Sequence, residues 1–387
     1  MDLMFVGCFA VLASAIALFA ASVPQGERGW WILLAAIVAL VVASRLIGGS
    51  LIGAIVLDLA ELAAMALVWS RGTVESAAAG RLYLSAILPA IVCTLIALAL
   101  IGGGGARPGP WIETLVVWLV ILGFALKLGL IPFSFWLPAV ASAAAPMTTA
   151  LIVSVVDIAT FGELAALRET SPWIFSAHPT AWLIVALLAM FGGAVLALAQ
   201  TELKQMLAYS TIDDLGFLLL GLIIGGPIGM AGAGLGALSH ALSKVILFGA
   251  VGVAEARIGQ SVTLDTHGLA ARLPVAGAAF IAGALSFIGV PPGFGFVGYW
   301  RIYVSATQFG GFALIVALLV VAALDLLCYA RAIHRTWLGS PQVQVAGAPA
   351  YLAAGVVASL AVVAVLLGCY PSLLTGAAAP GLLALAR

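Results

Sequence analysis

The most constraining feature of this sequence is a series of long apolar stretches separated by short polar connections. An α-helix needs about 20 predominantly apolar residues to cross the hydrocarbon layer of a bilayer, and on that basis the chain is expected to contain about twelve membrane-spanning helices. The expected spans are 3–23, 30–47, 51–70, 82–101, 111–131, 147–168, 180–199, 207–225, 230–255, 274–308, 311–333 and 350–369.

The composition supports an all-α polytopic membrane protein that is solvated by lipid. Of the 387 residues, 64% are hydrophobic and 8% are charged, whereas soluble domains carry about 25% charged residues. The longest connections, 256–273 and 334–349, are too short to form a domain, so residues 1–387 are expected to form a single transmembrane domain. The formal net charge of zero gives no electrostatic reason to expect a nucleic-acid partner.

The N-terminal apolar stretch is expected to be a retained helix, because no basic segment precedes it as in a signal peptide. The four cysteines stand singly in apolar runs, without the spacing of an iron–sulfur, zinc or haem site. The sequence therefore predicts neither a cofactor nor a metal ion. These cysteines are Cys8, Cys93, Cys328 and Cys369.

Two of the expected spans should be interrupted. The stretch 274–308 is too long for one straight helix and should break near Pro291 and Pro292. The stretch 111–146 should break at Pro132 and Pro138. Irregular backbone at membrane depth is tolerated only beside protein or water, so two broken helices indicate a transporter-like interior.

The basic residues of the connections predict the orientation. If the spans alternate, eight basic residues fall on one side of the membrane and four on the other. The positive-inside rule makes the first side cytoplasmic and places both termini on the opposite side. The eight are Arg28, Arg71, Arg81, Lys204, Arg257, Arg272, Arg331 and Arg335, and the four are Arg45, Arg107, Arg168 and Arg387.

Ionisable residues far from the helix ends are the strongest functional candidates, because a charge at the bilayer centre costs at least about 2.5–3.5 kcal/mol on insertion scales. Asp58 and Glu61 are three residues apart and share one helix face. Lys127 precedes the break at Pro132 and needs a carboxylate or water to remain charged. The alternatives are a carboxyl group that bonds a neighbouring helix, and a lysine that extends to the membrane surface.

His240 and Lys244 lie at positions i and i+4 of one helix and are expected to form a proton relay, with a buried structural histidine as the alternative. Asp157 and Glu163 share a span but are six residues apart, which predicts different faces.

Three further carboxyl groups have less defined roles. Asp213 and Asp214 are interpreted as N-terminal caps of the expected helix 207–225. Asp325 has no evident partner in the sequence. Titratable groups distributed over successive helices are what proton transfer through a membrane requires.

Four segments resemble the antiporter-like membrane subunits of respiratory complex I, membrane-bound hydrogenases and Mrp-type cation/proton antiporters. The first resembles their K-x4-PFHxWLPDAxxxAPTPVSALLH, the second their Q-x-DLKRLLAYSSISQMGY, the third their HALFKALLFLxxG and the fourth their LSLAGxPPxxGFxxK. In chain order, the segments are KLGLIPFSFWLPAVASAAAPMTTALI, ALAQTELKQMLAYSTIDDLGFLLLGL, SHALSKVILFGAVG and LSFIGVPPGFGFVGYW.

The resemblance implies two inverted five-helix repeats, at about 50–170 and 180–335, each with one broken helix. It assigns the family's glutamate to Glu61, its broken-helix lysine to Lys127, and its central histidine and lysine to His240 and Lys244. It implies that Lys127 carries protons under the influence of Glu61. Asp58 and Asp157 join these four residues as candidates for the proton pathway.

The chain departs from the family pattern at several positions. Ile152 replaces a frequent histidine, Ile158 falls on an alternative lysine position, and Tyr299 replaces the lysine or glutamate of the second broken helix. Asp213 and Asp214 replace the usual Ser-Gln. The first half-channel therefore matches the family better than the second.

The resemblance implies a non-redox subunit of a larger membrane complex of the complex I or hydrogenase type, in the cytoplasmic membrane of a bacterium. It would contact other membrane and peripheral subunits and conduct protons, or sodium ions. Two alternatives remain: a scaffold subunit that no longer pumps, and a membrane subunit of an Mrp-type antiporter or an inorganic-carbon uptake module.

Overall fold

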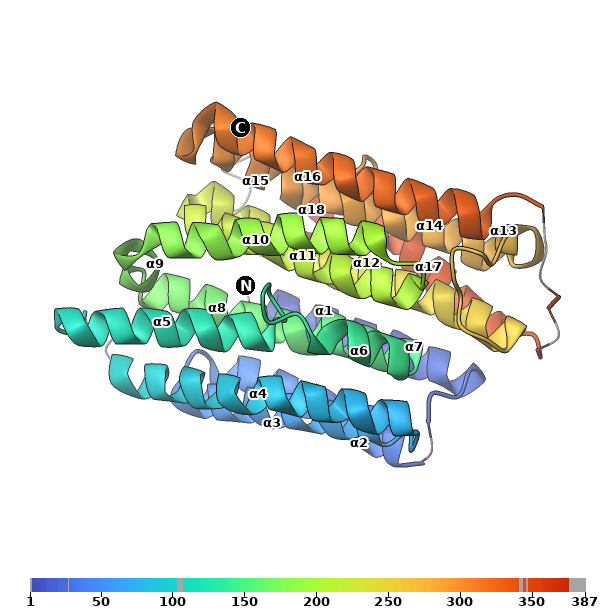
Figure 1. Cartoon of the computed structure of the whole chain (residues 1–387), viewed down its shortest axis with the longest axis horizontal. Helices are drawn as coiled ribbons and strands as arrows, with labels where there is room; N and C mark the ends of the chain where they lie inside the picture. The colour runs from blue at the N-terminus through green and yellow to red at the C-terminus, as the bar shows by residue number, and fades with distance from the viewer. Residues whose placement is uncertain (1, 27, 103–106, 341–343, 346, 376–387) are drawn as a thin grey trace.

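The computed structural model describes residues 2–26, 28–102, 107–340, 344–345 and 347–375, and these ranges are almost entirely helical (Figure 1). The long helices lie side by side and nearly parallel to the long axis of the view. Beyond the helices, an isolated antiparallel bridge joins Glu202 to Thr263.

Eleven helices of the described residues are long and apolar enough to cross a membrane. They match eleven of the expected spans. The expected twelfth, 274–308, is a pair of shorter helices, α14 and α15. The helices and their bounds are α1 (Asp2–Ser22), α2 (Arg28–Ile47), α3 (Leu51–Trp69), α4 (Val74–Ile101), α5 (Pro110–Lys127), α6 (Trp136–Ala143), α7 (Pro146–Leu151), η1 (Ile152–Val156), α8 (Asp157–Thr170), α9 (Trp173–Ala177), α10 (Pro179–Ala199), α11 (Leu203–Ile224), α12 (Gly226–Ile258), α13 (Leu269–Arg272), α14 (Pro274–Ile288), α15 (Gly295–Phe309), α16 (Gly311–Ala332), η2 (Ile333–Trp337), α17 (Tyr351–Cys369) and α18 (Ser372–Thr375).

Both predicted interruptions are confirmed. In the first, α5 ends at Lys127 and α6 begins at Trp136, and Gly129 between them has a φ of 60°. In the second, Gly289 has a φ of 79° between α14 and α15. Glycine adopts this left-handed conformation without the steric cost of a Cβ atom. The chain therefore turns directly after Lys127, and the side chain of the last residue of α5 remains among the surrounding helices.

Pro138 does not break a helix, contrary to the expectation from the sequence. It is the third residue of α6, which begins at Trp136. The N–H groups of the first helical turn have no partner within the helix, so a proline costs little there. The first interruption is therefore formed by the segment that contains Pro132.

The helix that follows the first interruption contains a π-helical segment, η1, between α7 and α8. The expected span 147–168 is thus one continuous helix in which one turn contains an extra residue. Such segments often lie at functional sites. Here it sets the rotation of α8, which begins with Asp157.

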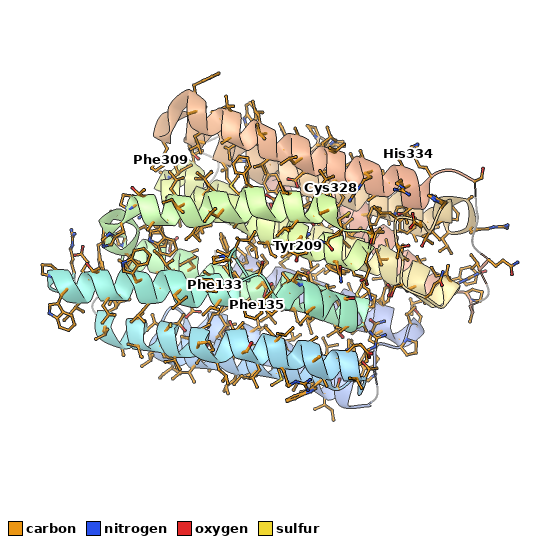
Figure 2. All side chains as sticks on the ribbon, in the orientation of Figure 1. Phe133, Phe135, Tyr209, Phe309, Cys328 and His334 are labelled. Carbon is orange, nitrogen blue, oxygen red and sulfur yellow. The ribbon has the colours of Figure 1, made fainter. Side chains whose placement is uncertain are left out.

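The centre of the bundle is α12, whose membrane-spanning window is completely buried by its neighbours. Glycines allow this close packing: a Cβ atom on Gly298 of α15 would lie 2.4 Å from the backbone nitrogen of Gly236 of α12. The outer helices instead carry exposed large apolar side chains, such as Trp111 and Phe312. Figure 2 shows side chains that project outward from the bundle, with Phe309 and His334 labelled near its opposite ends.

Candidate functional site

Lys127 is the last residue of α5 and is buried, with 2% of its surface exposed. The turn after it is fixed by hydrogen bonds: Leu130 N donates to the carbonyl of Ala125 (2.8 Å), and Trp136 Nε1 donates to the carbonyl of Leu126 (3.0 Å). The lysine therefore does not extend to the membrane surface. It occupies the fixed end of an interrupted helix inside the protein.

The Lys127 ammonium contacts both acids of α3. It donates a hydrogen bond to Asp58 Oδ1, and its Nζ lies 3.3 Å from Glu61 Oε1. Thr160 of α8 donates to the same Glu61 oxygen (2.8 Å). We call Asp58, Glu61, Lys127 and Thr160 the Lys127 centre. The sequence predicted a carboxylate or water beside this lysine, and the structure places two carboxyl groups there.

The Lys127 centre holds one cation against two carboxyl groups. All three side chains are almost completely removed from solvent. Burying charges is unfavourable unless they are paired and hydrogen-bonded. If both carboxyl groups are ionised, the centre carries one net negative charge and can accept a proton without becoming positive. Such an arrangement can store a proton and release it.

Asp157 and Glu163 both act on the Lys127 centre, although the sequence predicted different faces for them. Both are buried in α8. Asp157 interacts electrostatically with Glu61, and Glu163 interacts with Lys127. The expectation was incomplete because it considered one helix alone, whereas the centre is enclosed by α3, α5 and α8 together.

The second lysine, Lys244, is completely buried in α12 and binds neutral groups. Its ammonium donates hydrogen bonds to the carbonyl of Leu207 (2.8 Å) and to Ser210 Oγ (2.7 Å). Ser210 Oγ is also 2.9 Å from the hydroxyl of Tyr329. The Lys244 Nζ lies 3.9 Å from the centroid of the Phe287 ring, which is close enough for a cation–π interaction.

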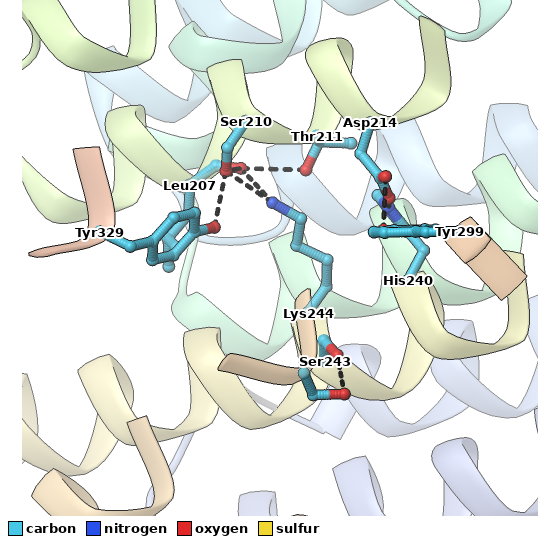
Figure 3. Close-up of polar contacts among 10 residues, drawn as sticks. Leu207, Ser210, Thr211, Asp214, His240, Ser243, Lys244, Tyr299 and Tyr329 are labelled. Carbon is cyan, nitrogen blue, oxygen red and sulfur yellow. Dashed lines mark hydrogen bonds and ion pairs between the residues drawn. The ribbon is translucent and has the colours of Figure 1, made fainter. Parts of the chain in front are cut away.

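His240 is also completely buried and binds Asp214 of α11, with 2.5 Å between Nδ1 and Oδ2. Tyr299 donates a hydrogen bond to the other oxygen of the same carboxyl group (2.5 Å). We call Ser210, Asp214, His240, Lys244 and Tyr299 the Lys244 centre (Figure 3). His240 and Lys244 were expected to form a relay through each other. In the structure both side chains bind residues of α11 instead, so any connection between them includes that helix.

Asp213 and Asp214 do not cap a helix, and that prediction was wrong. The helix α11 begins at Leu203, so both residues lie in its interior, where they are 2% and 4% exposed. Asp213 interacts electrostatically with Asp325 of α16. Asp325 therefore interacts with Asp213, a partner that the sequence could not supply.

The main acid of the Lys244 centre, Asp214, was missed as a site residue. The available signal was the placement of two adjacent carboxyl groups inside an otherwise apolar run. Ser210 and Tyr329 gave no such signal, because neutral hydroxyl groups are common in membrane helices. At the positions where the family has a histidine or a lysine, Ile152 and Ile158 are both fully buried.

Lys204 is a third buried lysine that the sequence assigned to a connection. It is 2% exposed, and its Nζ lies 3.2 Å from the carbonyl oxygen of Ser142 and 3.4 Å from Glu255 Oε1. Ser142 Oγ donates to Glu202 Oε2 (2.9 Å). These contacts join the end of α6 to α11 and α12 and fix the helices at one end of the bundle.

Metal binding was also considered for the described ranges. They contain no group of three or more His, Cys, Asp or Glu side chains arranged to hold a metal ion. The titratable side chains of the two lysine centres can take part in acid–base chemistry.

Several known proteins are similar to this chain in sequence. Residues 105–324 match the family described as NADH:quinone oxidoreductase/Mrp antiporter, TM. NADH-quinone oxidoreductase subunit N of Salinibacter ruber is 32% identical over 299 residues, which are 76% of this chain and 56% of that protein. Formate hydrogenlyase subunit 3 of Escherichia coli is 30% identical over 292 residues, which are 69% of this chain and 47% of that protein.

A solved structure agrees with these sequence matches. A chain in the structure of respiratory complex I from Thermus thermophilus with bound aureothin has a TM-score of 0.79 and 26% identity, over 96% of this chain and 85% of that chain. The chain spans about half the length of the curated relatives it matches.

Proposed function

Because the chain belongs to the NADH:quinone oxidoreductase/Mrp antiporter membrane family, we propose that it conducts protons as a non-redox subunit of a larger membrane complex. The observation that carries this proposal is the Lys127 centre. A buried lysine at a helix break contacts two carboxyl groups, and proton transfer requires such closely spaced titratable groups inside the membrane.

In this proposal a proton moves between titratable groups, and each group that accepts a proton later gives it up. Glu61, Asp58 and Lys127 form the first group, and His240, Lys244 and Asp214 form the second. Asp157 lies on α8 and interacts electrostatically with Glu61. The η1 segment, which directly precedes α8, packs against α12, which carries His240. The continuous helix formed by α7, η1 and α8 therefore connects the two centres.

We further propose the cytoplasmic membrane of a bacterium as the location, with both termini on the non-cytoplasmic side and two inverted repeats in the chain. The excess of basic residues in one set of connections supports this orientation. The repeated pattern of two helices separated by a proline-containing break supports the repeats. The named relatives, a quinone oxidoreductase subunit and a formate hydrogenlyase subunit, support a partner complex with redox subunits.

The test is proton translocation by the purified complex in sealed vesicles, measured with a pH-sensitive dye after the complex is energised by its electron donor. The wild-type complex should acidify one compartment, and the complex with Lys127→Ala should not. Equal acidification by both complexes would reject the proposal. Repeating the measurement with and without sodium, in the presence of a protonophore, distinguishes protons from sodium ions as the coupling ion.

A scaffold subunit that no longer pumps is the second candidate, and Tyr299 favours it. Where the family places a lysine or glutamate, this chain has a phenol group, whose reference pKa is near 10. Its hydroxyl donates to Asp214, which keeps the residue inside the polar network but does not replace a proton-carrying group. A complex that transfers electrons normally with Lys127→Ala and translocates no fewer protons would favour the scaffold.

A further inference from the structure

A small cavity of about 20 Å³ lies next to the turn between α2 and α3, and Glu163 of α8 lines it. One water molecule needs about 10–15 Å³ of such space. The cavity is lined by polar as well as apolar groups, including Ser44, Ser50 and Glu163. Leu57, the residue before Asp58, lines it too. The cavity is therefore large enough to hold one water molecule.

Glu163 is the acid that faces this cavity. It is 7% exposed, and neither of its carboxylate oxygens accepts a hydrogen bond from the described residues. Thr160, one turn earlier on α8, donates to Glu61, so this face of α8 reaches the Lys127 centre. A buried carboxyl group without hydrogen bonds is unfavourable. A water molecule in the adjoining cavity can provide the missing donors.

Arg45 of α2 lies against the helix that carries Glu163. A Cβ atom on Gly162, the neighbour of Glu163, would come 3.0 Å from Arg45 Nη1, so the guanidinium lies directly against α8. Arg45 also lines the cavity and attracts Glu163 electrostatically. Because a guanidinium keeps its proton in proteins, Arg45 supplies a permanent positive charge at this position.

The charges that act on Glu163 come from three helices. They are Arg45 of α2, Asp58 of α3 and Lys127 of α5. Glu163 therefore lies within electrostatic reach of Lys127 as well as of Arg45. The chain thus places a carboxyl group between a buried lysine and a cavity near the surface.

We propose that Glu163 is a further proton-transfer residue, which connects Lys127 to the membrane face that carries the turn at Gly48–Ser50. This inference rests on the proposed function and names a route for it. The Lys127 ammonium gives its proton to the Glu163 carboxylate, leaving a neutral amine and a carboxylic acid. The acid then gives the proton to water in the cavity, and the carboxylate is restored.

The route ends on the face that the basic residues identify as non-cytoplasmic, because Arg45 and Arg168 belong to its connections. A proton could then leave from the first half of the molecule. Such an exit would bypass Tyr299 in the second broken helix, where the chain lacks the family's charged residue.

The first experiment compares Glu163→Gln with Glu169→Gln in the energised complex. Glu169 is exposed and lies on the same helix. We expect Glu163→Gln to lower the proton translocation rate about tenfold or more, equivalent to about 1.4 kcal/mol in the barrier, and the control to leave it unchanged. Glu163→Asp, which keeps the carboxyl group, should recover part of the rate. Unchanged translocation in Glu163→Gln, or no recovery in Glu163→Asp, would overturn the relay.

The second experiment tests access without relying on transport. Silver ions, which are small and bind thiolates, are added to one side of sealed vesicles that contain the complex with Glu163→Cys. Protection of the thiol from later alkylation is measured by mass spectrometry. The tryptic peptide 128–168 contains no native cysteine, so its alkylation reports position 163 alone. Ala159→Cys on the same peptide is fully buried and does not line the cavity, so it serves as the control.

We expect silver to protect Glu163→Cys from the non-cytoplasmic side and to leave Ala159→Cys unprotected. Protection from the cytoplasmic side alone, or equal protection of both variants, would overturn the route. If Lys127→Ala translocates protons normally while Glu163→Cys is protected, the proposed function fails and the cavity remains accessible. If Lys127→Ala is inactive and Glu163→Gln is fully active, the proposed function stands and this route is wrong.

Discussion

The two halves of the molecule each bury a lysine, and they compensate its charge in different ways. Lys127 contacts two carboxyl groups directly. Lys244 instead binds a serine hydroxyl, a backbone carbonyl and an aromatic face. Loss of the Lys127 proton would leave two buried carboxyl groups without their cation. Loss of the Lys244 proton would break no direct ion pair.

The difference also separates the acids of the two centres. In the Lys244 centre the carboxyl group of Asp214 binds His240 and Tyr299 rather than the lysine. The Asp214 carboxyl group acts on Lys244 by electrostatic attraction. In the first half the lysine therefore contacts its acids directly. In the second half the lysine and the acid bind different partners within one network. Four substitutions test this comparison.

The largest effect is expected for Lys127→Ala. It removes the cation from two buried carboxyl groups, and breaking a buried ion pair costs about 3–5 kcal/mol. Translocation should be lost, and the thermal stability of the subunit should decrease. Lys127→Arg keeps the charge, but a guanidinium does not release its proton, so it should restore stability without translocation. A proton-translocating Lys127→Arg complex would show that this lysine need not release a proton.

Asp58→Asn should have the next largest effect. The sequence resemblance gives Glu61 the leading role, whereas Lys127 donates its hydrogen bond to Asp58 in the structure. Because hydrogen bonds to charged groups contribute about 1.5–3 kcal/mol, we expect Asp58→Asn to reduce translocation at least as strongly as Glu61→Gln. The two variants are compared by dye-based translocation at equal amounts of assembled complex. A clearly larger loss in Glu61→Gln would restore the order that the resemblance implies.

Asp214→Asn should have an intermediate effect. The amide keeps the size of the side chain but removes the charge that binds His240 and Tyr299. We expect translocation to fall by about threefold to tenfold, corresponding to about 0.7–1.4 kcal/mol, while Lys244 keeps its bonds to Ser210 and Leu207. The same measurement in Asp265→Asn, an exposed acid in the connection after α12, provides the control. No change in Asp214→Asn would indicate that the second half does not conduct.

The smallest effect is expected for Tyr299→Phe. It removes one hydrogen bond from Asp214, which retains His240 as a partner. Proton translocation should change by less than about fivefold, because a single hydrogen bond contributes about 1 kcal/mol. A loss as large as that of Lys127→Ala would show that the exit passes through Tyr299. It would also remove the main support for the scaffold alternative.

The sequence alone determined the architecture of this protein. The lengths of the apolar runs give the number of membrane helices because the bilayer sets their length. The prolines and glycines near Lys127 and near Pro291 locate both breaks because they restrict backbone conformation locally. Position in the chain was also sufficient to select Asp58, Glu61, Lys127, His240 and Lys244, since an ionisable group inside a membrane is expensive and therefore rare.

Only the tertiary structure decided which of these groups meet. Lys127 and Asp58 are 69 residues apart, and Tyr299 and Asp214 are 85 apart, so no local spacing could pair them. The assignment of Asp213 and Asp214 to a helix cap failed because the helix begins earlier, at Leu203, than its apolar run suggests. The rotation and packing of α3, α8, α11 and α12 bring the side chains together. Those depend on contacts between helices distant in sequence, which a pattern along one helix does not contain.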